Sequence, residues 1–169
     1  MRLKKYSLMQ NSTRIIAIDP GYDRLGIAII DKMKGSKESY VYSECFQTPK
    51  TLSHAHRLAS IAKRMREIIA IYKPERLAIE TLFLANNQKT AMYVAEARGV
   101  VITECALSNM EVFEYSPPQI KLAVCGDGRA DKKSIMRMVP MLLKIPNTVK
   151  IDDEFDAIAI GLTCFAIEK

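Results

Sequence analysis

Three short strand-like runs open this 169-residue chain, and helical patterns appear only after them. Residues 14–19 (RIIAID) are rich in β-branched side chains, and the run stops at Pro20 and Gly21, which favour a turn. Residues 25–30 and 39–46 have the same strand character. Strands that follow one another so closely along a chain are typical of an antiparallel meander.

Helices and single strands alternate over the rest of the chain. Apolar positions recur at helical spacing over residues 53–72, and Pro74 ends that helix. Strands are predicted at residues 77–80 and 112–115, on either side of a long helix over residues 87–107. Three further helices are predicted, one opened by Pro117 and Pro118 with Ser116 as its cap, one over residues 132–143 and one over residues 153–167. The order β-β-β-α-β-α-β-α predicts an α/β fold with a five-stranded mixed sheet, three strands antiparallel and the others parallel, and helices on both faces.

One domain is expected over residues 14–169, because no linker rich in Gly, Ser or Pro divides them. Residues 1–13 are basic and then polar, so they are interpreted as a flexible lead-in and not as a secretory signal. No apolar run approaches the roughly 18 residues of a membrane helix. These features predict a cytoplasmic protein, and its net charge of +6 favours acidic partners such as nucleic acid.

Two acidic residues end predicted strands. Asp19 closes the first strand and Glu80 closes the fourth, at the carboxyl ends where open α/β sheets usually place their sites. If these two strands are neighbours, the two carboxylates lie side by side. Either acid could instead be a simple turn former.

Two more acids stand in the first turn of the last helix. Asp153 and Asp156 are three residues apart and share one helical face, although Asp152 and Asp156 share a face as well. Asp152 is interpreted as the N-cap, since an acid at this end of a helix is favoured by the helix dipole. The helix is apolar on two sides and is therefore expected to be buried, with its acids directed toward the interior.

Four carboxylates that converge repel one another, and divalent cations are the natural remedy. Oxygen ligands favour hard ions, with Mg²⁺ expected first and Mn²⁺ as its substitute. Two such ions support the hydrolysis of a phosphodiester. The acids therefore predict a metal-dependent nuclease, provided that the fold brings them together.

From residue 14 onward the sequence resembles the RuvC family of crossover junction endodeoxyribonucleases. The matching segments are residues 18–21 (IDPG), 78–80 (AIE) with Phe83 after them, 96–99 (EARG), 112–115 (VFEY) and 153–160 (DEFDAIAI). The resemblance implies an RNase H-like fold and a nuclease that resolves four-way (Holliday) junctions during recombination and repair. The family's four metal-binding acids correspond to Asp19, Glu80, Asp153 and Asp156, which favours Asp153 over Asp152.

The resemblance also suggests roles in DNA binding. Phe83 corresponds to an aromatic residue that wedges against bases at the junction centre, although a core position would explain it equally well. Lys121 and Lys132 correspond to lysines near the active site, and Arg129 and Lys133 add positive charge beside them. The resemblance further implies a homodimer, with residues 87–107 as a candidate interface, and branch-migration proteins as partners.

Three other classes of protein share part of this pattern. Another RNase H-like nuclease, acting on RNA or an RNA–DNA hybrid, would use a similar set of acids. Actin-like kinases also begin with a strand, an acid and a glycine hairpin, but they need two such domains. A DNA-binding module without catalysis would be expected to lack at least one of the four acids.

Overall fold

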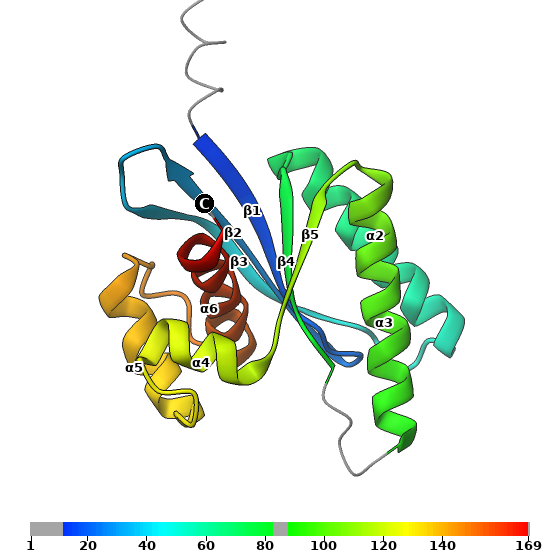
Figure 1. Ribbon diagram of the computed structural model, residues 1–169. Helices are drawn as coiled ribbons and strands as arrows, with labels where there is room; N and C mark the ends of the chain where they lie inside the picture. Colours follow the sequence, from blue (N-terminus) through cyan, green and yellow to red (C-terminus); the bar gives the residue numbers. More distant parts are fainter. Residues whose placement is uncertain (1–11, 83–87, 169) are drawn as a thin grey trace, which may run out of the picture.

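The computed structural model describes residues 12–82 and 88–168, which form a five-stranded sheet with helices on both sides (Figure 1). The strands lie in the order β3-β2-β1-β4-β5. The antiparallel meander consists of β1 (Ser12–Asp19), β2 (Arg24–Met33) and β3 (Glu38–Gln47). On the other side of β1, β4 (Arg76–Glu80) and β5 (Glu111–Tyr115) run parallel to it. The predicted mixed sheet is confirmed.

Two groups of helices cover the sheet (Figure 1). One face is covered by α2 (His54–Tyr72) and α3 (Gln88–Leu107). The other face is covered by α4 (Pro117–Cys125), α5 (Lys132–Leu142) and α6 (Asp152–Ile167). Ser53 and Ser116 are the N-caps of α2 and α4, as the sequence predicts for Ser116. In the described part of the chain, no helix has the length and apolar character needed to cross a membrane.

The sequence of β1 is continuously apolar from Ile15 to Ile18 because both faces of this strand are buried. Ile15 and Ala17 pack into the core beneath α4, α5 and α6, whereas Ile16 and Ile18 pack into the core beneath α2 and α3. Because successive side chains of a strand point to opposite faces, Asp19 lies on the same face as Ala17. The same alternation places Glu80 on the face of Ala78, which belongs to the α6 core.

The helix α6 packs against the sheet, and its residues from Glu154 to Phe165 are buried except for Asp156, which is half-buried. Its contact with β1 and β2 depends on Gly161. A Cβ atom at this position would lie 2.7 Å from Ile30 Cδ1 and 3.1 Å from Ala17 Cβ. A larger residue would therefore force Ile30 or the helix itself to shift.

The prediction that Asp152 caps α6 is wrong. Ile151 is the N-cap, and it makes no side-chain cap bond. Asp152 is instead the first helical residue, and its carboxylate forms ion pairs with Arg24 and Lys132. These two cations come from β2 and α5, so a pattern confined to the helix could not reveal them.

Substituting Gly161 with Ala is expected to lower the free energy of unfolding by about 1–3 kcal/mol, because the added methyl overpacks the contact between α6 and the strands. Urea unfolding followed by circular dichroism would measure the change as a lower midpoint at constant slope. A variant that unfolds at the wild-type midpoint would contradict the close approach described for α6.

Candidate active site

Asp19 and Glu80 lie side by side at one edge of the sheet. The strands β1 and β4 are parallel neighbours, and their register pairs Ile18 with Ile79. The next residues along these strands are the two acids, on the face covered by α6. The condition stated from the sequence, that the two strands be neighbours, is thus met.

The first turn of α6 lies against the end of β1. A Cβ atom at Gly26 would come within 2.2 Å of the Asp153 carbonyl oxygen and 3.1 Å of Asp19 Cβ. Only a residue without a side chain fits here, so Gly26 lets the backbone of α6 approach the acid that ends β1. The fold thereby brings Asp153 and Asp156 to the carboxylates of the sheet.

A cavity of about 180 Å³ opens between the sheet edge and helices α4, α5 and α6. Three of the predicted acids and two of the predicted lysines line it. The polar lining consists of Asp19, Glu80, Asp156, Lys121 and Lys132, and the apolar lining consists of Pro117, Ile120, Ile135 and Ile160.

Asp153 adjoins this cavity but does not line it. Its carboxylate forms an ion pair with Arg24 of β2 and accepts a bond from Cys45 Sγ at 3.5 Å. Arg24 is a site residue that the sequence interpretation missed. Nothing in the pattern of the β1–β2 hairpin distinguishes it from a solvated charge, since its carboxylate partners are more than a hundred residues away.

Burial and mutual repulsion raise the pKa values of the acids in the cavity. Burial, followed by the charges of Asp156, Glu80 and Asp153, raises the pKa of Asp19 to about 8. Burial and the charge of Asp156 raise the pKa of Glu80 to about 7. The pKa of Asp156 is raised as well, mainly by burial, although its ion pair with Lys132 opposes the shift.

Two cations offset part of this repulsion. Lys132 Nζ lies 2.9 Å from Asp156 Oδ2 and 2.8 Å from Asp152 Oδ2. Burial disfavours its ammonium, but these carboxylates outweigh burial and raise the pKa of Lys132. The positive charges of Lys121 and Lys132 act on Glu80 and hold its pKa below the value that burial and Asp156 would impose.

The donor chemistry fits a hard divalent cation, although the acids do not converge on one point. Within residues 12–82 and 88–168, no three His, Cys, Asp or Glu side chains lie close enough to hold one ion together. Asp153 and Asp156 are turned toward Arg24 and Lys132 instead. Half-buried carboxylates with raised pKa values, beside a cavity and near one another, are nevertheless the oxygen-rich environment that such a cation stabilises.

Two of the remaining predicted residues, Arg129 and Lys133, lie outside the cavity. Arg129 is exposed in the loop before α5, where its backbone N–H donates to Asp127 Oδ1 at 2.9 Å. Lys133 is exposed on the first turn of α5. Phe83 falls outside the described residues, so the suggestion that it wedges into a junction stays a prediction.

The variant Asp19→Asn is expected to be more stable than the wild type when no metal is present. Because the pKa of Asp19 in the folded protein lies above its ordinary value of 3.8, the ionised carboxylate opposes folding. This penalty is absent below pH 3.8, grows as the pH rises and is complete above about 8. Removing the carboxylate should therefore stabilise the protein by about 2–4 kcal/mol at pH 8 and by much less at pH 4.5.

Denaturant unfolding at both pH values, with a chelator present, would measure this difference. Glu111→Gln is the matched control, because it removes one negative charge at the start of β5, an exposed position at the opposite end of the parallel strands. A stabilisation of Asp19→Asn that does not change with pH would contradict the repulsion inferred for the cavity.

Comparison with known protein families agrees with this geometry. A family model described as Crossover junction endodeoxyribonuclease RuvC matches residues 15–164. Proteins of that name from Caldicellulosiruptor saccharolyticus and Alkaliphilus oremlandii are 38% and 41% identical to this chain. Each alignment covers 88% of this chain and 90% of the relative.

Solved structures lead to the same family. The structure of Thermus thermophilus RuvC in complex with a Holliday junction substrate superimposes with a TM-score of 0.82 at 29% identity, covering 89% of this chain and 92% of that one. The yeast mitochondrial Holliday junction resolvase superimposes with a TM-score of 0.70 over 91% of this chain and 78% of its own. At 12% identity, the yeast structure shows a common fold and nothing more.

Proposed function

The chain belongs to the RuvC family of crossover junction endodeoxyribonucleases, and from this we propose how its own residues cut a four-way DNA junction. It is an endonuclease with an RNase H-like fold, and its activity is the resolution of Holliday junctions. The observation that carries the proposal is the cavity at the end of β1 and β4, which three half-buried carboxylates and two lysines line together.

In this proposal, Asp19, Glu80, Asp153 and Asp156 hold divalent cations, Mg²⁺ first and Mn²⁺ as a substitute, and each site takes two ions. The chemistry that such ions supply is activation of a water molecule and stabilisation of the leaving oxygen of the scissile phosphodiester. Support for the acid set comes from the pKa values of Asp19 and Glu80, which are raised to about 8 and about 7 by burial and like charge. Asp153 and Asp156 bind the metal ions once their carboxylates leave Arg24 and Lys132.

The two lysines of the cavity bind and orient the DNA backbone. Lys121 lies on α4 and Lys132 on α5, so they face the acids that end the strands from the helices that cover this side of the sheet. An ammonium at this position attracts the phosphate and stabilises negative charge that develops during cleavage. The apolar side chains of Ile120, Ile135 and Ile160 reduce the access of bulk water and thereby strengthen these interactions.

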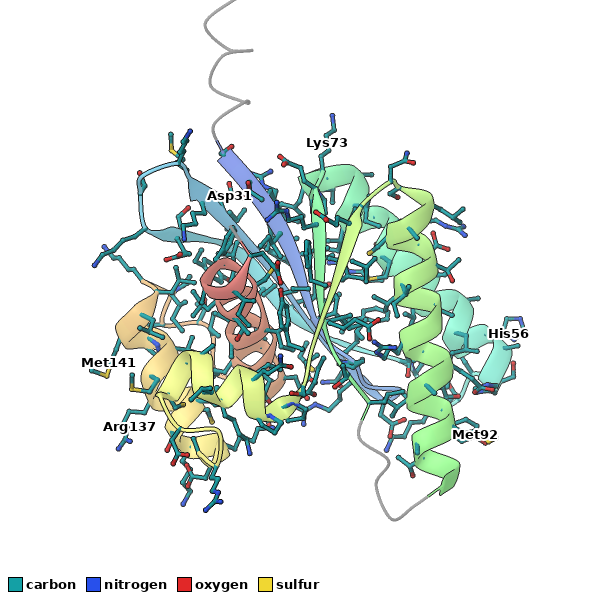
Figure 2. The ribbon with its side chains drawn as sticks, in the orientation of Figure 1. Asp31, His56, Lys73, Met92, Arg137 and Met141 are labelled. Carbon is teal, nitrogen blue, oxygen red and sulfur yellow. The ribbon has the colours of Figure 1, made fainter. Side chains whose placement is uncertain are left out.

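We further propose a homodimer that uses the outer side of α3. A shallow groove between α2 and α3 is lined mainly by small and apolar side chains, among them Leu58, Ala62 and Val100. Met92, 61% exposed, projects from α3 away from the sheet (Figure 2). A two-fold dimer suits a junction, which has two symmetric scissile strands. The proposal places the protein in the cytoplasm, with branch-migration proteins as further partners.

Cleavage of synthetic substrates tests the proposal. We expect paired nicks in a four-way DNA junction with Mg²⁺, little cutting of linear duplex or RNA–DNA hybrid, and a loss of at least about a hundredfold in Asp19→Asn and Glu80→Gln. Both variants should still bind the junction in a gel-shift assay. Cutting of the hybrid with the junction left intact would instead favour a nuclease that acts on RNA.

Two adjacent lysines should differ in their effect on cleavage. Lys132→Ala is expected to lower kcat by about a hundredfold or more, because this ammonium lies in the cavity. Lys133→Ala removes the same charge at an exposed position outside the cavity, so it should act mainly on affinity and lower the slope of log K against log salt by about one. Equal losses of kcat in the two variants would contradict the assignment of Lys132 to the site.

A further inference from the structure

A chain of ion pairs connects two proposed metal ligands through a carboxylate that is not one of them. Arg24 of β2 contacts both Asp152 and Asp153, and Lys132 of α5 contacts both Asp152 and Asp156. Asp152 divides its two oxygens between these cations. Its Oδ1 lies 2.8 Å from Arg24 Nη2, and its Oδ2 lies 2.8 Å from Lys132 Nζ.

The position of Asp152 separates it from the acids of the cavity. It does not line the cavity, and its side chain is 38% exposed, against 16% for Asp153 and 22% for Asp156. Asp152 is therefore paired with both cations at the rim, outside the group of acids that line the cavity.

Arg24 and Lys132 thus each contact one proposed metal ligand, Asp153 or Asp156. Each also contacts Asp152, which is not a proposed ligand. When Asp153 and Asp156 turn to a divalent cation, Arg24 and Lys132 each lose a carboxylate. Both cations are partly exposed, 44% for Arg24 and 51% for Lys132, and a cation left without a partner would compete with the metal ion for these carboxylates. Asp152 offers both cations a carboxylate that remains in place throughout.

We propose that Asp152 is a positioning residue of the nuclease site, which retains Arg24 and Lys132 at the rim while Asp153 and Asp156 pass to the metal ions. The inference rests on the proposed function, because it requires that these two acids bind metal. Its consequence is that Asp152 strengthens metal binding through Arg24 and Lys132, and not merely through its own negative charge. Arg24 and Lys132 are then held where they can meet the phosphates of the junction.

Titration of the metal-free protein with Mn²⁺, with free Mn²⁺ measured by electron paramagnetic resonance, tests this inference without cleavage. Asp152→Asn should raise the Mn²⁺ dissociation constant about 5- to 10-fold, because both cations then compete for the ligands. In an Arg24→Gln background, Asp152→Asn should raise the Mn²⁺ dissociation constant by no more than about threefold, since Arg24 no longer competes with the ion for the carboxylates. Asp152→Glu should restore most of the affinity, and Glu111→Gln serves as the control for the loss of one distant charge.

Cleavage kinetics add a measurement that a merely structural role would not change. In Asp152→Asn, the Mg²⁺ concentration at half-maximal rate should rise, whereas kcat at saturating Mg²⁺ should stay within about threefold of the wild type. A damaged α6 would instead lower kcat at every Mg²⁺ concentration and reduce the melting temperature.

The outcomes separate this inference from the proposed function. An equal loss of Mn²⁺ affinity with and without Arg24 would mean that Asp152 acts only through its charge, and the inference would be overturned. An unchanged affinity in Asp152→Asn would overturn it as well. The variant Asp19→Asn tests the metal site itself: wild-type Mn²⁺ binding in that variant would refute the proposed function, whatever Asp152 does.

Discussion

The packing of α6 against β1 and β2 decides where the acids of this helix lie relative to the acids that end the strands. Gly161 and Gly26 permit this contact, one in the middle of the helix interface and one beneath its first turn. The apolar body of α6 anchors the helix in the core, and the acids of its first turn are consequently held at the end of β1. Burying polar groups costs free energy, and the packing of α6 supplies the rigid support that holds them there.

The site that results is destabilised by its own charges. Asp19 and Glu80 are pushed toward protonation near neutral pH, and Asp156 is shifted in the same direction. Arg24 and Lys132 relieve part of this repulsion from outside, through β2 and α5. Carboxylates placed to bind a cation repel one another when no cation is bound. A functional site of this kind is therefore expected to lower the stability of the fold.

The sequence predicts most of the fold because the fold is built from local patterns. Strand runs such as residues 14–19 end in turn-forming residues. In residues 53–72, apolar residues recur at the spacing of a helix. The acids at the ends of β1 and β4 could be identified for the same reason, since each stands where a strand pattern stops. The N-cap of α6 could not be identified correctly, because the carboxylate of Asp152 is drawn to cations that come from other elements.

By itself, then, the sequence determined the order of strands and helices, the family to which the chain belongs, and the four acids that this family implies. Only the tertiary structure decided how those acids are arranged: Asp19, Glu80 and Asp156 line one cavity, whereas Asp153 is turned aside to Arg24. It alone brought Arg24 and Lys132 together around Asp152. The physical reason is that periodicity reports which face of an element is buried, whereas ion pairs depend on distances between elements far apart in the chain.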